Sequence, residues 1–105
     1  MAPVARYWLG YVLLRSGADP LQAFVHLSVA VGLDPQAAMY RNSRDEALMR
    51  VLAAAEQYAR AGRRQEACEQ VAAAASVADR CGAQDLAQRC RDALRQYAAP
   101  QTQPQ

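Results

Sequence analysis

Apolar positions along the chain recur every three to four residues, and short turn signals separate the segments in which they do so. Gly17, Gly62 and Gly82 follow such segments, and Asp-Pro pairs at 19–20 and 34–35 precede others. Glycine favours the end of a helix, and Asp before proline favours its start. No stretch alternates with the period of two that marks a β-strand. The pattern therefore predicts an all-α fold of antiparallel helical hairpins without a β-sheet.

The boundaries of these segments predict about five helices in a single domain, residues 1–97. The predicted helices cover residues 3–16, 20–32, 35–61, 65–80 and 84–97. Ser43 and Glu46 have the spacing of a capping box, so residues 35–61 form either one helix or two. Residues 98–105 are rich in proline and glutamine, and we expect them to be a disordered tail.

The first 33 residues are unusually apolar, with Arg6, Arg15 and Asp19 as their only charged side chains. The stretch YWLGYVLL has apolar or aromatic residues at every angle of a helix, a pattern typical of a helix buried on all sides. Two helices cannot bury each other completely, so we expect another chain to cover part of this surface. The uncharged run 20–33 is shorter than the ~20 residues that cross a membrane, and no secretory signal is evident, so we expect a cytoplasmic protein.

Candidate chemistry is sparse. The single histidine, His26, stands among apolar residues, and the spacing of Cys68, Cys81 and Cys90 matches no zinc site. We expect reduced, buried thiols, no metal or other cofactor, and no enzymatic activity. The net charge is only +2, although all twelve basic residues are arginines. Nucleic-acid binding usually needs a stronger basic excess, so a nucleic-acid-binding regulator is a distant alternative.

Two stretches share an order of small and large residues. The first contains Gly17, Ala23, Leu27 and Ala30, and the second contains Gly62, Ala67, Val71 and Ala74. This order resembles the tetratricopeptide repeat, whose helix pairs use small residues where the helices touch. The resemblance covers residues 3–35 and 48–81. It implies that residues 84–97 form a solvated end helix. It implies that Gly10 faces the packing partner and that Leu9 and Leu13 fill the space between helices.

The resemblance also implies a concave groove lined by the first helix of each pair. The groove residues would be Val4, Tyr7, Tyr11, Leu14, Met49, Leu52, Glu56 and Ala59. Such an apolar, aromatic groove suits an apolar or amphipathic helical segment of a partner protein. Further candidate interface residues are Trp8, Phe24 and His26. Tyr7, Trp8 and Tyr11 can equally be ordinary core residues.

The residues thus favour an interaction protein, a small adaptor or chaperone of the tetratricopeptide type. The alternative is an obligate homodimer in which the N-terminal hairpins of two copies pack together. No membrane partner is expected.

Overall fold

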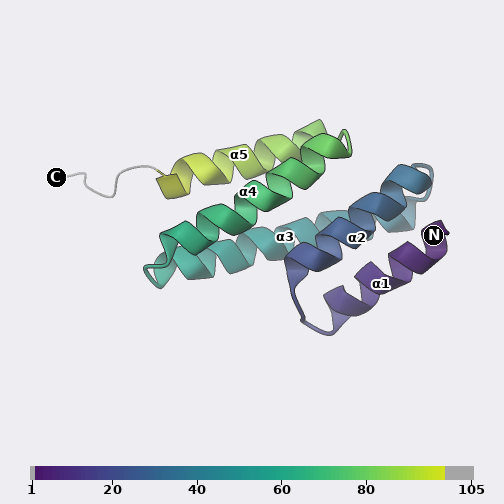
Figure 1. Ribbon diagram of the computed structural model, residues 1–105, viewed down its shortest axis with the longest axis horizontal. Coiled ribbons are helices and arrows are strands. Elements are labelled where there is room, and N and C mark those ends of the chain that lie inside the picture. Colours follow the sequence, from purple (N-terminus) through teal and green to yellow (C-terminus); the bar gives the residue numbers. More distant parts are fainter. Residues whose placement is uncertain (1, 99–105) are drawn as a thin grey trace.

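The computed structural model describes residues 2–98, and within them it contains five α-helices and no β-strand (Figure 1). The helices are α1 (Pro3–Arg15), α2 (Pro20–Leu33), α3 (Ala38–Arg60), α4 (Arg64–Arg80) and α5 (Gln84–Ala98). This confirms the predicted all-α class. The predicted tail begins one residue too early, because Ala98 still belongs to α5, and the rest of it lies outside the described residues.

The predicted turn residues end or start helices at the positions that they occupy in the sequence. Gly17, Gly62 and Gly82 adopt positive φ angles of 73°, 82° and 74° beyond α1, α3 and α4. This left-handed conformation suits glycine, which has no Cβ atom, and it ends each helix. At the start of α2, the Asp19 carboxylate accepts a hydrogen bond from the backbone N–H of Leu21 at 3.0 Å.

The third predicted helix differs from the structure in two ways. It starts at Ala38 instead of Pro35, because Asp34 ends α2 and a short turn precedes α3. The predicted capping box also does not form, and of the two alternatives for this segment the structure has one continuous helix. The Ser43 hydroxyl faces the hydroxyl of Tyr7 and Glu46 pairs with arginines, so neither side chain caps a helix. Residues 38–60 contain no glycine or proline to interrupt them.

Consecutive helices pack side by side as antiparallel neighbours, and α2 also contacts α4 (Figure 1). Phe24 and Leu27 of α2, Leu48 of α3 and Val71 of α4 are at most 1% exposed and form the centre of the core. Buried alanines surround them, and their small side chains allow the helices to approach each other closely. No helix within residues 2–98 combines the length and hydropathy needed to span a membrane.

Candidate protein-docking surface

Helix α1 presents apolar side chains on two opposite faces. Tyr7, Gly10 and Leu14 lie on its inner face and are buried. Val4, Trp8, Leu9 and Val12 lie on its outer face and remain between 45% and 59% exposed. We call Val4, Ala5, Trp8, Leu9 and Val12 the outer stripe.

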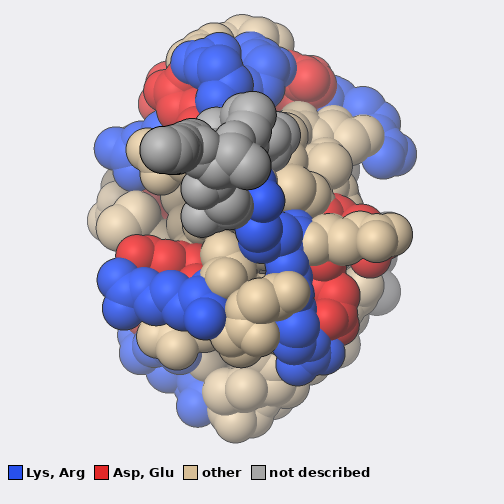
Figure 2. All heavy atoms as spheres, turned by 90° about the vertical axis from the view of Figure 1, so that its left-hand side faces the viewer, with Lys and Arg blue, Asp and Glu red and all other residues tan. Residues whose placement is uncertain are grey.

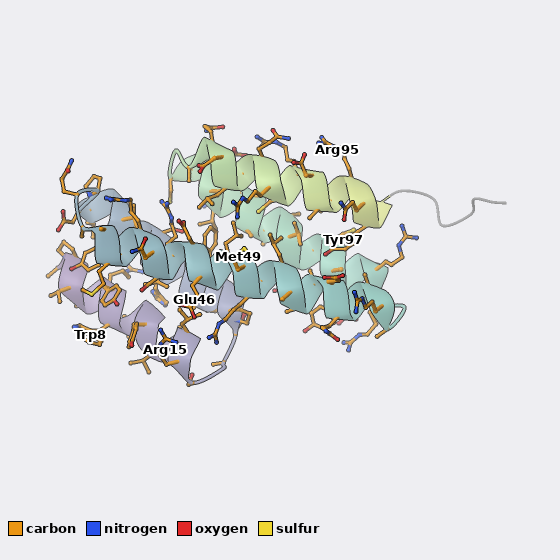
Figure 3. All side chains as sticks on the ribbon, turned by 180° about the vertical axis from the view of Figure 1, so that it is seen from behind. Trp8, Arg15, Glu46, Met49, Arg95 and Tyr97 are labelled. Carbon is orange, nitrogen blue, oxygen red and sulfur yellow. The ribbon has the colours of Figure 1, made fainter. Side chains whose placement is uncertain are left out.

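The outer stripe borders an open, shallow hollow of about 570 Å³ along α1. Ala5, Trp8, Leu9, Val12 and Leu13 line this hollow. Its walls come from a single helix, and Trp8 stands at the edge of the helical array (Figure 3). A row of side chains spaced by four residues on one helix forms a continuous surface, which a second helix can cover.

The other end of the array is different. On the exposed side of α5 the side chains are polar: Gln88, Arg89, Asp92, Arg95 and Gln96. Stacked helical arrays need terminal helices with a polar outer face for solubility, and α5 has one. Helix α1, the opposite terminal helix, does not.

Aromatic packing places the N-terminal aromatic residues differently from the predicted groove. Tyr7 is 3% exposed, and its ring stacks on Tyr40 of α3 with the centroids 4.7 Å apart. Tyr11 stacks on Tyr7 at 5.6 Å and is partly buried. Trp8 meets both tyrosine rings edge-on, at 5.5 Å and 5.4 Å, while the rest of its side chain is exposed. Trp8 alone among the three thus has most of its contact surface free.

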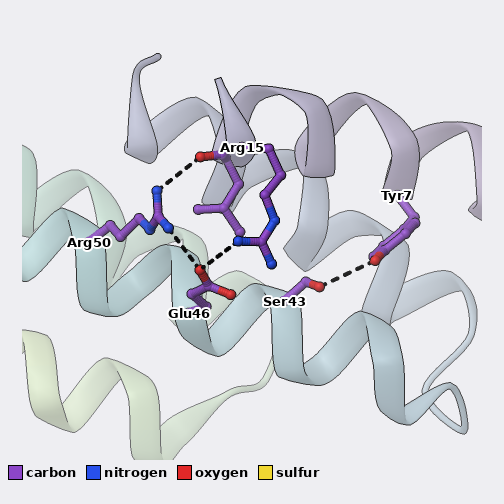
Figure 4. A network of polar contacts seen from close by, with 6 residues as sticks. Tyr7, Arg15, Ser43, Glu46 and Arg50 are labelled. Carbon is purple, nitrogen blue, oxygen red and sulfur yellow. Dashed lines mark hydrogen bonds and ion pairs between the residues drawn. The ribbon is translucent and has the colours of Figure 1, made fainter. Parts of the chain in front are cut away.

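A polar network closes the junction between α1 and α3 (Figure 4). Arg50 of α3 donates a hydrogen bond to the backbone carbonyl of Leu14 at 3.0 Å and pairs with Glu46 at 3.0 Å. Arg15 pairs with the same carboxylate at 3.6 Å, and the hydroxyls of Tyr7 and Ser43 are 3.4 Å apart. Direct contacts therefore occupy the space in which the groove was expected.

The groove assignment is wrong for Tyr7 and Leu14, which are buried and thus inaccessible to a partner. Leu52 and Ala59 are partly buried against the core. Val4 is 51% exposed and stands at the edge of the outer stripe, beside the buried Tyr7 three residues later.

On α3, Met49 is 55% exposed and lies on the side of α5, where the Arg89 guanidinium approaches its sulfur at 3.7 Å (Figure 3). Glu56 is exposed and pairs with Arg60 at 2.7 Å. The predicted groove residues are therefore not brought together on one surface.

The further candidate interface residues also differ in their exposure. Trp8 is exposed, whereas Phe24 is fully buried, so its assignment to an interface is wrong. His26 is partly buried, and its Nδ1 atom accepts a hydrogen bond from Arg6 at 3.2 Å. The pKa of His26 lies below its ordinary value, mainly because the side chain is partly buried and also because the Arg6 charge is near.

Sequence reasoning missed Val12 and Ala5 and placed Leu9 wrongly, since Leu9 is 45% exposed and does not fill an interhelical space. A signal for the outer stripe was present in the four-residue spacing of Val4, Trp8 and Val12. The same helix has a second apolar face with similar spacing, and only the position of α2 and α3 decides which one is buried.

The described residues contain few groups that could bind a metal or react with a ligand. Within residues 2–98, no three His, Cys, Asp or Glu side chains lie close enough together to hold a metal ion. Cys90 is buried as expected, Cys68 is partly buried, and Cys81 is exposed, so the prediction of buried thiols is wrong for Cys81.

The arginines do not form an unpaired basic surface. Seven of the twelve pair with a carboxylate: Arg15, Arg44, Arg50, Arg60, Arg63, Arg91 and Arg95. The other five contact a histidine, a carbonyl, a hydroxyl or a thioether: Arg6, Arg41, Arg64, Arg80 and Arg89. Figure 2 shows basic and acidic side chains side by side over the end of the molecule near the α3–α4 turn.

Comparisons of this chain with models of protein families, with curated proteins and with solved structures gave no match. The surface geometry is therefore the basis for a functional proposal.

Proposed function

We propose that this protein is a non-enzymatic interaction module, a small adaptor or chaperone that holds an apolar or amphipathic helical segment of another protein. The observation that carries the proposal is the outer stripe. Four large apolar side chains on one terminal helix are each about half exposed. Contiguous exposed apolar surface of this kind marks interaction sites on soluble proteins.

The tetratricopeptide-like character is part of the same proposal. The stacked antiparallel helices, the alanine-rich contacts between them and the polar end helix α5 support it. The docking surface, however, differs from the one that the family resemblance implies. It lies on the outer face of α1 and not in a groove between α1 and α3.

A pull-down from cells of the source organism tests this proposal, with Val12→Glu and Met49→Glu as a matched pair of variants. Both residues are more than half exposed, so both variants are expected to fold. We expect Val12→Glu to lose the captured partner and Met49→Glu to retain it. Loss of the captured partner with Met49→Glu but not with Val12→Glu would contradict the proposal. It would instead support binding in the predicted groove.

The homodimer alternative uses the same outer stripe, which carries no charge at its centre. Light scattering on the pure protein tests it across a range of concentrations. A stable dimer that Val12→Glu dissociates would make the second copy the occupant. The nucleic-acid alternative is not proposed, because the net charge is only +2 and seven of the twelve arginines pair with a carboxylate.

A further inference from the structure

We propose that the outer stripe takes an amphipathic helix of another protein whose apolar face is bordered by aspartate or glutamate side chains. This inference rests on the proposed function and specifies the chemistry of the partner. Two arginines, one along each long edge of the stripe, point to it.

The positions of Arg15 and Arg6 follow from helix geometry. Arg15 comes three residues after Val12, which places it on the edge of the stripe that faces α3. Arg6 comes three residues before Leu9, on the edge that faces α2, where it reaches His26. A helix lying on the stripe therefore meets the exposed Arg15 guanidinium on one side. On the other side it meets Arg6, which is half-buried and whose guanidinium reaches His26 of α2.

No acidic side chain balances these charges within the N-terminal hairpin helices. Neither α1 nor α2 contains an aspartate or glutamate. Among the described residues, Arg6 has no carboxylate within ion-pair distance, and its hydrogen-bond partner His26 has a lowered pKa and is uncharged at neutral pH. The Arg6 charge is thus uncompensated.

Arg15 can exchange its ion-pair partner while its guanidinium stays over the Tyr11 ring, 5.1 Å from the ring centroid. Its side chain is 52% exposed, and it shares the Glu46 carboxylate with Arg50, which lies closer to that carboxylate. Exposed ion pairs of this kind are weak, so exchange of Glu46 for a carboxylate of the partner costs little. Arg50 continues to neutralise Glu46 after such an exchange.

A second copy of this chain fits the stripe less well. Its own α1 has two arginines and no acidic residue. The arginines at the edges of two stripes therefore form no ion pairs with each other and repel where they come close. The area is small whichever chain covers the stripe, so it favours neither occupant by itself. A whole tryptophan side chain buries on the order of 250 Å², so four half-exposed side chains provide less than the ~800 Å² that each partner buries in a stable interface. Additional ion pairs along the edges would strengthen the contact, and these need acidic groups.

Two synthetic helical peptides test the inference. Both have about 20 residues, enough for marginal helicity in isolation, and the same leucine face. Glutamates border that face in one peptide, and lysines border it in the other. Trp8 is the only tryptophan of the chain, so its emission reports coverage of the stripe directly. We expect the glutamate peptide to bind about tenfold more tightly, since two attractive edge pairs replace two repulsive ones.

Charge reversal on the protein provides the matched test. Arg15→Glu should abolish or invert the preference between the two peptides. Arg95→Glu on α5 reverses an exposed, ion-paired arginine away from the stripe and should leave the preference unchanged. In about 1 M salt, which screens such pairs, the two peptides should bind with similar affinity.

The outcomes separate this inference from the proposed function. Equal binding of both peptides, prevented by Val12→Glu, would overturn the acidic-partner inference and leave the docking function standing. Binding of neither peptide would overturn both. A dimer of the pure protein that hides Trp8 from the peptides would also overturn the inference, with a second copy as the occupant.

Discussion

Gly10 of α1 lies directly against the side chain of Leu27 in α2. A Cβ atom placed on Gly10 would stand 2.6 Å from Cγ of Leu27 and 3.1 Å from the backbone oxygen of Ala23. Leu27 is fully buried, so it has little room to move. The absence of a side chain at residue 10 therefore sets the distance between the first two helices.

We expect Gly10→Ala to destabilise the protein by about 1–3 kcal/mol through overpacking, although alanine is the better helix former by about 1 kcal/mol. Gly32→Ala in α2 is the matched control. Nothing lies within 4 Å of a Cβ atom at this position, so helix propensity alone should make the change neutral or stabilising. Urea unfolding followed by circular dichroism measures both. A stabilised Gly10→Ala variant would contradict the close approach of α1 and α2.

Tyr7 and Trp8 are neighbours in sequence with opposite environments, and their alanine variants should differ accordingly. Tyr7→Ala removes the buried ring that stacks on Tyr40, at an expected cost of about 3 kcal/mol or more. Trp8→Ala removes a half-exposed ring and should cost about 1 kcal/mol or less. Equal losses of unfolding free energy would show that Trp8 belongs to the core, and the outer stripe would lose its central residue.

Arg50 joins the end of α1 to α3, and its removal should matter more than that of an ordinary surface arginine. Arg50→Ala leaves the Leu14 carbonyl without its guanidinium donor, so we expect a loss of about 1–2 kcal/mol. Arg60→Ala removes only an exposed pair with Glu56 and should change stability by about 0.5 kcal/mol or less. Chemical denaturation measures the unfolding free energy of both variants. Similar losses would show that the bond from Arg50 to the Leu14 carbonyl does not stabilise the contact between α1 and α3.

The lowered pKa of His26 makes stability depend on pH in a defined direction. The folded protein disfavours protonation of His26, so the unfolded chain binds more protons as the pH falls below the ordinary histidine value near 6.5. Stability is therefore complete above that value and is lost as the pH falls towards the lower pKa of the folded state. Unfolding measured between pH 7 and pH 5 should show this loss, and His26→Gln should reduce it. An unchanged pH dependence in His26→Gln would assign the loss to other groups.

Two of the three cysteines, Cys81 and Cys90, should react at very different rates with a thiol reagent. Cys81 is exposed, whereas Cys90 is buried, and burial raises the pKa of its thiol to about 11. Because the thiolate is the reactive form, we expect rapid alkylation of Cys81 and protection of Cys90 until the protein unfolds. Peptide mass spectrometry after brief treatment with iodoacetamide measures both positions. Early modification of Cys90 would show that α5 opens readily from α4.

Much of the fold could be predicted from local signals. Gly17 and Asp19 mark the end of one helix and the start of the next through their own backbone and side-chain preferences, which act within a few residues. The start of α3 could not be predicted so well. Asp34 is an equally good helix start by itself, but its backbone N–H completes α2 by bonding to Ala30. The capping box at Ser43 failed because Tyr7 and the two arginines offered its side chains other partners.

The sequence by itself determined the helical class and the excess of apolar surface in the first helix, since each depends on residue type and spacing along one segment. Which face of α1 is exposed was decided only by tertiary structure. Tyr7 and Val12 are both apolar residues of the same helix, and their spacing cannot tell an inner face from an outer one. The stack of Tyr7 on Tyr40 and the bond from Arg50 to Leu14 join segments more than thirty residues apart and fix the rotation of α1. That rotation turns Val4, Trp8, Leu9 and Val12 outward as the candidate docking surface.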